Sequence, residues 1–200
     1  MALAGEWMSP YLWGFALGFS AVFLYATVFV LDDDLARERF RPPSKGADAV
    51  ALRWIRLSAL AAVVLAPLDS GRFHWSAEVL PAIRILGIAG FAIGFWLVVD
   101  AMRANHYFSP VIRIQDERGH HVVDQGPYAI IRHPGYLGML IVSPMSVLAL
   151  GSLWALIPAA VYWTLILRRV VAEDRFLRAN LDGYAQYAGR VRSRVIPGIW

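Results

Sequence analysis

The longest uncharged stretch of the chain runs from Gly135 to Leu167 and contains 33 residues. As one straight helix it would be roughly 50 Å long, whereas the hydrocarbon core of a bilayer is about 30 Å thick. Pro144, Gly151 and Pro158 interrupt the stretch. It therefore predicts a tight hairpin of two membrane helices that breaks around Gly151.

Three further apolar runs precede this hairpin. Residues 7–31 carry no charge, residues 52–68 hold Arg53 and Arg56 near their start, and residues 85–99 are rich in glycine. Arginines at a helix start can extend to the membrane interface, and small residues let helices approach closely in lipid. Because a helix satisfies its own backbone hydrogen bonds in lipid, the runs predict an all-α integral membrane protein with five transmembrane helices.

The composition supports a membrane protein. Hydrophobic residues make up 58% of the chain and charged residues 17%, whereas soluble domains are nearer half and a quarter. There is no cysteine, which excludes disulfides, thiolate metal sites and cysteine nucleophiles. The net charge of +4 does not indicate nucleic acid, because the basic residues flank apolar segments. No basic region precedes residues 7–31, so we expect a retained helix and not a cleaved signal peptide.

The basic residues orient the predicted helices. The predicted helices place 17 of the 19 Lys and Arg residues on one side of the membrane, including those of the predicted polar loop 32–48. Only Arg72 and Arg84 fall on the other side. Positively charged loops stay on the cytoplasmic side. We therefore predict an N-terminus outside, with 102–134 and 168–200 cytoplasmic, in the inner or plasma membrane if the source is prokaryotic.

A turn-rich motif, "GPYAIIRHPGYLG", occupies residues 126–138. Gly-Pro marks a turn, and Pro134 disfavours helical geometry at His133 and can itself open the next helix. Arg132 and His133 therefore precede a helix N-terminus, where free backbone N–H groups favour an anion. The motif predicts a carboxylate or phosphate site at the membrane surface, and an interfacial anchor is the alternative.

The C-terminal tail offers a second pair of reactive side chains. Arg169 and Glu173 are four residues apart and share a helix face, and Leu177 continues that face. The alternative is an exposed ion pair of small energetic value. His120 and His121 lie near no cluster of carboxylates, so a metal site is not predicted. The chain contains no Gly-rich phosphate loop and no Rossmann fingerprint.

Three segments together resemble the isoprenylcysteine carboxyl methyltransferase family: "GHHVVDQGPYAIIRHPGYLG", "RRVVAEDRFL" and "YAQYAGRVRSRVIPGIW", with an apolar hairpin between the first two. Members are membrane enzymes that use S-adenosylmethionine and are related to phospholipid N-methyltransferases. The resemblance covers about half the chain, from Asn105 onward, and implies one membrane-embedded methyltransferase domain over 1–200. Within it, residues 7–101 form three N-terminal transmembrane helices and residues 102–200 the cofactor-binding catalytic half.

The resemblance also implies which residues form the site. Those expected at the adenosine part of S-adenosylmethionine are His120, His121, Val122, Val123 and Tyr128. Those expected at its methionine end are Arg132, His133, Pro134 and Gly135, with His133 near the carboxylate. The implied catalytic residues, facing the acceptor and the reaction centre, are Arg169 and Glu173. Two positions depart from the family pattern: its usual Glu-Glu pair is Glu173-Asp174 here, and its usual small polar residue after the RHP proline is Gly135.

The prediction is a methyltransferase whose acceptor is lipophilic or delivered from the membrane, such as an isoprenylcysteine carboxylate or a lipid headgroup. A carboxylate, an amine, a thiol and a small hydrophobic metabolite all remain open as the acceptor. One alternative is a sterol reductase-like oxidoreductase that binds NADPH, because "VRSRVIPGIW" resembles the ending of those enzymes. The other is a non-enzymatic membrane scaffold, against which the presence of Arg132, His133 and Glu173 argues.

Overall fold

The structure is a computed structural model that describes residues 9–41 and 48–200. Over these residues it is all-helical and contains no strand, which confirms the predicted all-α class. Residues 7 and 8 of the expected first helix lie outside the described residues, as do residues 42–47 of the predicted polar loop.

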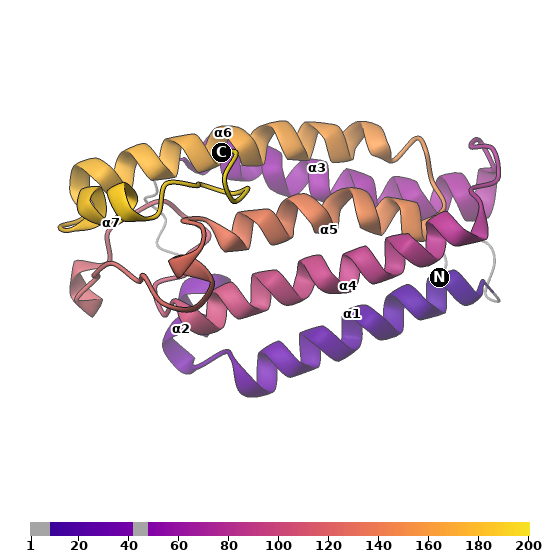
Figure 1. Ribbon diagram of the computed structural model, residues 1–200. Helices are drawn as coiled ribbons and strands as arrows, with labels where there is room; N and C mark the ends of the chain where they lie inside the picture. The colour runs from indigo at the N-terminus through magenta and orange to yellow at the C-terminus, as the bar shows by residue number, and fades with distance from the viewer. Residues whose placement is uncertain (1–8, 42–47) are drawn as a thin grey trace.

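Five long helices run side by side along the bundle (Figure 1). They are α1 (Pro10–Phe29), α3 (Ala49–Pro67), α4 (Pro81–Ala104), α5 (Pro134–Leu150) and α6 (Leu156–Asn180). The shorter elements are α2 (Asp33–Phe40), η1 (Leu68–Phe73), η2 (Asp116–Arg118), η3 (Gly126–Ala129) and α7 (Tyr184–Arg190). Helices α4 and α5 lie at the centre, with α1 on one side and α3 and α6 on the other (Figure 1).

The predicted break in the 33-residue apolar stretch is confirmed. Helix α5 begins at Pro134, whose missing N–H suits the first helical position. The helix ends at Leu150 because Gly151 adopts a left-handed conformation with φ of 78°. The next helix, α6, starts at Leu156.

Three helical segments of the described chain are long and apolar enough to cross a membrane: α1, α3 continued by η1, and α4. Helix α5 is also apolar but has only 17 residues, and α6 carries charged side chains in its second half. Large apolar side chains such as Leu17, Phe29 and Leu60 remain exposed along the bundle. An exposed apolar surface of this kind is what an integral membrane protein presents to lipid.

Close packing between α4 and α5 depends on glycine, as the Gly-rich run predicted. Gly94 of α4 faces Gly138 of α5. A Cβ atom on Gly138 would lie 2.5 Å from the Gly94 carbonyl oxygen and 2.7 Å from a methyl of Val98. Because only glycine fits there, the two helix backbones can approach closely.

The prediction of a loop over residues 32–48 is wrong for its first half. Residues Asp33–Phe40 form α2, whose N-cap Asp32 accepts a hydrogen bond from Leu35 N–H at 2.7 Å. Leu35 is buried against the bundle. The sequence contained this signal, because acidic residues occupy the first turn and arginines the last, as the helix dipole favours.

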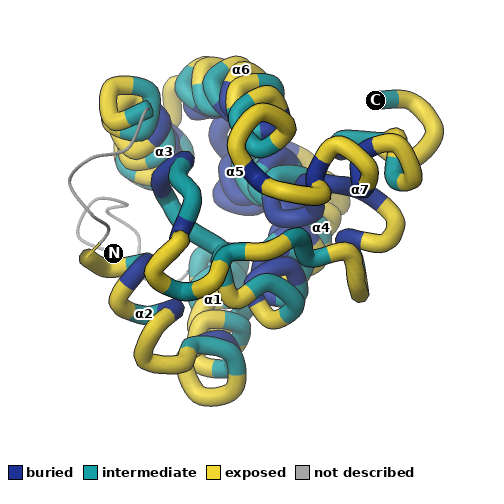
Figure 2. The backbone as a smooth tube through the Cα atoms, turned by 90° about the vertical axis from the view of Figure 1, so that its left-hand side faces the viewer, coloured by how far each residue is buried: buried dark blue, intermediate teal, exposed yellow. Residues whose placement is uncertain are grey.

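The two ends of the bundle differ. One end carries α2, the segment 105–133, α7 and the C-terminal tail, and Figure 2 looks onto it. The opposite end carries η1 and the α5–α6 turn, where buried Asp69 accepts hydrogen bonds from the hydroxyls of Ser76 and Ser152. The segments 102–134 and 168–200 therefore share one end, as the distribution of basic residues predicted.

Candidate active site

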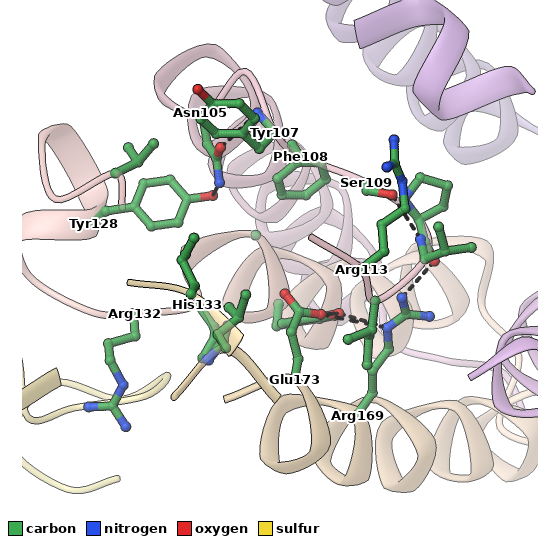
Figure 3. A pocket seen from close by; sticks show the side chains of 18 of the residues that line it. Asn105, Tyr107, Phe108, Ser109, Arg113, Tyr128, Arg132, His133, Arg169 and Glu173 are labelled. Carbon is green, nitrogen blue, oxygen red and sulfur yellow. Dashed lines mark hydrogen bonds and ion pairs between the residues drawn. The ribbon is translucent and has the colours of Figure 1, made fainter. Parts of the chain in front are cut away.

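A cavity of about 300 Å³ lies at the end of the bundle that carries α2, α7 and the segment 105–133 (Figure 3). Of the eleven site residues predicted from the sequence, all except Pro134 line this cavity. The ten are His120, His121, Val122, Val123, Tyr128, Arg132, His133, Gly135, Arg169 and Glu173. Pro134 is buried at the first position of α5. The fold thus gathers the segments 120–135 and 169–173 around one volume of the size of a small-molecule site.

Arg169 and Glu173 do not form the exposed ion pair that their spacing alone allows. Arg169 is 5% exposed, and its Nε donates to the Tyr136 hydroxyl at 2.7 Å. The same hydroxyl donates to Glu173 Oε2 at 2.5 Å, while Arg169 Nε and Glu173 Oε2 are 3.9 Å apart. Asp48 and the Pro110 carbonyl hold the rest of the guanidinium at 2.8 and 2.6 Å. Tyr136, which sequence analysis did not select, links the predicted catalytic pair.

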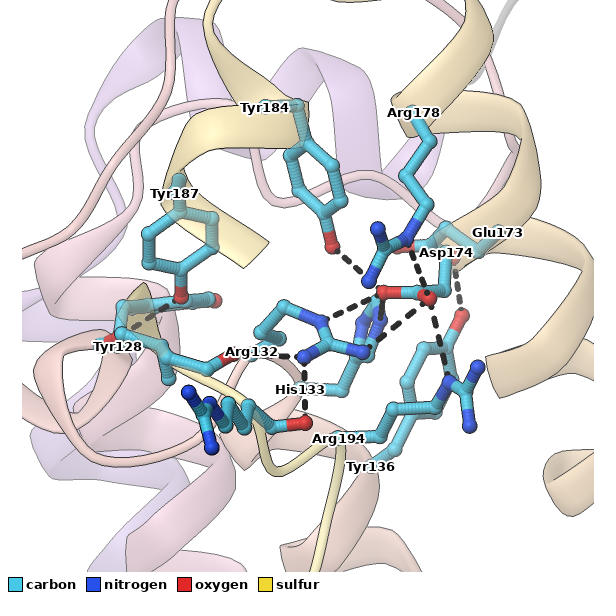
Figure 4. A network of polar contacts seen from close by, with 12 residues as sticks. Tyr128, Arg132, His133, Tyr136, Glu173, Asp174, Arg178, Tyr184, Tyr187 and Arg194 are labelled. Carbon is cyan, nitrogen blue, oxygen red and sulfur yellow. Dashed lines mark hydrogen bonds and ion pairs between the residues drawn. The ribbon is translucent and has the colours of Figure 1, made fainter. Parts of the chain in front are cut away.

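A buried carboxylate, Asp174, organises a second network (Figure 4). Arg132 donates from Nε to Asp174 Oδ1 at 2.7 Å and from Nη2 to Oδ2 at 3.2 Å. Three further donors reach the same carboxylate at 3.2 Å: Arg178, Arg194 and Tyr184. Burial alone would raise the pKa of Asp174, but the adjacent His133 and Arg132 side chains hold this pKa well below its usual range. The carboxylate stays ionised and joins α5, α6 and the tail.

The start of α5 differs from the simple anion site that the sequence predicted. The remaining donors of Arg132 are directed at the Val191 and Arg192 carbonyls, at 2.6 and 2.7 Å. The backbone N–H groups of Arg132 and His133 also donate to tail carbonyls, at 3.0 and 2.8 Å. By contrast, the buried His133 Nε2, 3.5 Å from Asp174 Oδ1, has no hydrogen-bond partner among the described residues.

His120 and His121 are held by a tyrosine of their own segment. The Tyr107 ring packs on His120 with ring centres 4.4 Å apart, and its hydroxyl lies 2.8 Å from His121 Nδ1. Burial lowers the pKa of His120, and the Gln115 N–H donates to its Nδ1 at 3.3 Å; both favour the neutral imidazole. Within the described ranges, no group of His, Asp or Glu is arranged to hold a metal ion.

Tyr128 lies where the segment 105–133 meets α7. Its hydroxyl accepts a hydrogen bond from the Asn105 side chain at 3.4 Å, and its carbonyl accepts one from the Tyr187 hydroxyl at 2.7 Å. Asn105, Tyr184 and Tyr187 also line the cavity, although sequence analysis did not select them. The spacing of the two α7 tyrosines was a usable signal, because residues three apart share a helix face.

Helix α2 is tied to the segment 105–133 and forms part of the cavity wall. Glu38 accepts hydrogen bonds from Arg113 Nη2 at 2.8 Å and from the Ser109 hydroxyl at 2.5 Å. Burial alone would raise the pKa of Glu38, but these donors lower it, so the carboxylate stays charged. The next residue, Arg39, lines the cavity with its guanidinium 5.3 Å from the centre of the Phe108 ring.

Comparison with known proteins identifies the family. A model of the isoprenylcysteine carboxyl methyltransferase (ICMT) family matches residues 85–179. Protein-S-isoprenylcysteine O-methyltransferase A of Arabidopsis thaliana is 31% identical over 149 residues, which is 74% of this chain and 72% of that protein. The chain belongs to the ICMT family. This confirms the resemblance carried by the GPY and RHP motifs.

Two more ICMT relatives match over a shorter range. Protein-S-isoprenylcysteine O-methyltransferase B of Arabidopsis thaliana is 35% identical over 94 residues, 46% of this chain and 48% of that protein. The protein-S-isoprenylcysteine O-methyltransferase of Schizosaccharomyces pombe is 30% identical over 106 residues, 52% of this chain and 45% of that protein. The chain thus spans about half the length of these two relatives. All of these names are methyltransferase names, and none supports the reductase alternative.

The ICMT match has a clear boundary in the structure. It begins within α4 and ends in α6, so it covers all eleven predicted site residues but neither α2 nor α7. The cavity residues Arg39, Tyr184 and Tyr187 therefore lie outside the matched range. Part of the cavity wall is supplied by segments that the family model does not describe.

Proposed function

We propose that this protein transfers a methyl group from S-adenosylmethionine to a lipophilic acceptor of the isoprenylcysteine carboxylate type, free or attached to a protein. The observation that carries the proposal is the convergence of ten predicted site residues on one cavity. Membership of the ICMT family and the names of the relatives support the same chemistry. A lipid headgroup amine, the other acceptor expected from the sequence, has no comparable support from these names.

The residues around the cavity fit S-adenosylmethionine chemically. The cofactor's carboxylate needs a donor, and the buried His133 Nε2, 3.5 Å from Asp174, makes no hydrogen bond within the described part of the chain. Its adenosine needs apolar and aromatic surface, which Val122, Val123 and Tyr128 offer. Its ammonium group needs an acceptor, and the Glu173 side chain, 24% exposed, offers one on the cavity wall. These assignments follow the donor and acceptor types of the lining residues.

The other predicted cofactor residues shape this site. Backbone near His120 and His121 contributes to the adenosine wall, and Arg132 and Pro134 hold the start of α5 in place, which orients His133. A Cβ at Gly135 would lie 2.5 Å from the Phe108 ring, so glycine at this position leaves room for the aromatic side chain. The family usually has a small polar residue at this position. In this chain the Phe108 ring packs against Gly135 instead.

The bound cofactor supplies a methyl group that its sulfonium has already activated. The chain's part is to orient the acceptor about 3 Å from that methyl and to exclude water. Leu52 and Ile55 of α3, Met139 of α5 and Ile166 of α6 line the cavity toward the bundle, which suits an apolar acceptor. Arg169, held by Tyr136 and Asp48, offers positive charge that attracts an anionic acceptor to the cavity.

The His133→Ala variant tests the cofactor assignment. We expect S-adenosylmethionine to bind about ten- to a hundredfold more weakly, because one charge-assisted hydrogen bond is lost. Isothermal calorimetry on the purified full chain in detergent measures the affinity, with NADPH as the competing ligand. His106→Ala is the matched control, because its side chain is 71% exposed and is not among the cavity residues. Unchanged affinity in a folded His133→Ala protein would contradict the assignment.

We also propose that all five long helices cross the membrane, with the N-terminus outside and the cavity on the cytoplasmic face. The 17-to-2 distribution of basic residues supports this orientation. The gathering of segments 102–134 and 168–200 at one end of the bundle is consistent with it.

Cysteine labelling tests the orientation, because the natural chain has no cysteine. Ala77 is exposed at the end with η1, and Ala185 is exposed on α7 at the cavity end. We expect a membrane-impermeant maleimide applied to intact cells to label Ala77→Cys and to label Ala185→Cys only after lysis. Labelling of Ala185→Cys in intact cells, or equal labelling of both variants, would refute the orientation.

A further inference from the structure

The cavity lining contains more arginines than carboxylates that pair with them. Five arginines line the cavity: Arg39, Arg56, Arg113, Arg132 and Arg169. Three of them, Arg113, Arg132 and Arg169, each have a carboxylate oxygen within 2.8 Å. Arg39 and Arg56 form no ion pair with any residue in the ranges 9–41 and 48–200. The sequence of residues 42–47, directly after α2, contains no carboxylate.

Arg39 is the more enclosed of these two cations. It is half-buried and lies against the Phe108 ring, whereas Arg56 is exposed. Burial lowers the pKa of Arg39, and the positive charges of Arg169 and Arg56 lower it further. An enclosed cation surrounded by other cations is unfavourable unless an anion compensates it. Over residues 9–41 and 48–200, no carboxylate pairs with Arg39.

The cofactor does not provide this charge. S-adenosylmethionine carries a sulfonium and an ammonium group against one carboxylate, so its binding adds net positive charge. The groups that bear on the pKa of Arg39 are Tyr136, Tyr162, Arg169 and Arg56. All four line the cavity, and Tyr136 and Arg169 are hydrogen-bonded to each other there. Arg39 thus belongs to the acceptor side of the cavity.

We propose that Arg39 is a specificity-determining residue that binds the carboxylate of the acceptor, an inference that rests on the proposed methyl transfer. In the reaction the acceptor carboxylate oxygen forms a bond to the methyl carbon while the carbon–sulfur bond breaks and its electron pair remains on sulfur. No proton moves. The anionic acceptor becomes a neutral ester and the sulfonium a neutral thioether. Arg39 therefore pairs with the substrate but not with the product, which favours release of the ester.

Steady-state kinetics of Arg39→Gln in the purified full chain test this inference. The probe acceptor is an S-prenyl cysteine with a free carboxylate and an amide-capped amine. We expect its KM to rise about ten- to a hundredfold, as for the loss of a charge-assisted hydrogen bond, with S-adenosylmethionine affinity unchanged. Arg37→Gln is the matched control: it removes the same charge from an exposed position of the same helix, and Arg37 does not line the cavity.

A second measurement separates anion binding from packing. The carboxamide analogue of the acceptor is used as a competitive inhibitor of the wild-type and variant proteins. We expect wild type to bind the carboxylate more tightly than the carboxamide and Arg39→Gln to bind both alike, while Arg39→Lys, which keeps the charge, retains part of the preference. An unchanged preference in a folded Arg39→Gln protein, or weaker cofactor binding with acceptor KM unchanged, overturns the inference. A wild-type protein that binds no S-adenosylmethionine refutes the proposed function itself.

Discussion

We expect Glu173→Gln to lower turnover about a hundredfold while the protein stays folded, because a charge-assisted contact to the cofactor is lost. Glu173 lines the cavity, and its Oε2 accepts a 2.5 Å hydrogen bond from Tyr136. Glutamine has nearly the same shape but no charge, so it cannot hold the cofactor's ammonium group as an anion. The measurement is single-turnover methyl transfer from labelled S-adenosylmethionine.

Glu78→Gln is the control for this variant, because Glu78 is exposed at the opposite end of the bundle and is not a cavity residue. The cofactor affinity of the Glu173→Gln protein shows whether the carboxylate acts in cofactor binding or in methyl transfer. A matching loss of affinity indicates that Glu173 holds the cofactor, and unchanged affinity indicates that it acts on the reacting groups. Near wild-type turnover in folded Glu173→Gln would remove this residue from the site.

We expect Asp174→Asn to cost about 3–5 kcal/mol of the free energy of unfolding, the usual range for removing one partner of a buried ion pair. The Asp174 side chain is 2% exposed, and the variant would leave Arg132, also 2% exposed, without its anion. The measurement is the thermal unfolding midpoint in detergent. Asp124→Asn is the matched control, because Asp124 pairs with Arg190 at 2.7 Å while both side chains are exposed, and such a pair contributes about 1 kcal/mol or less.

The pH dependence of stability gives a second test of Asp174. Because its folded-state pKa is held well below the usual range, its stabilising contribution is fully present above the ordinary carboxyl pKa of about 4. That contribution is lost as the pH falls below this value. The stability difference between wild type and Asp174→Asn should therefore shrink in acid. A difference that is absent at neutral pH would contradict the structural role of this carboxylate.

The sequence by itself determined the helical class, the break at Gly151 and a close helix approach at the Gly-rich run of α4, although not which helix approaches. Each of these is encoded locally: hydropathy sets the helices, a glycine with positive φ ends α5, and the lack of a side chain at Gly94 admits the neighbouring backbone. Ten of the residues that line the cavity were also foreseeable, because they lie in short motifs that resemble those of a known family.

The pairing of those residues was decided only by the tertiary structure. Arg132, expected to meet a bound anion, pairs with Asp174, which is 42 positions away in the chain. Tyr136 joins Arg169 to Glu173, and α2, expected to be a loop, brings Arg39 to the cavity. Residue type and spacing limit what a charged side chain can do, but its partner depends on which distant elements the packed helices bring within hydrogen-bond distance.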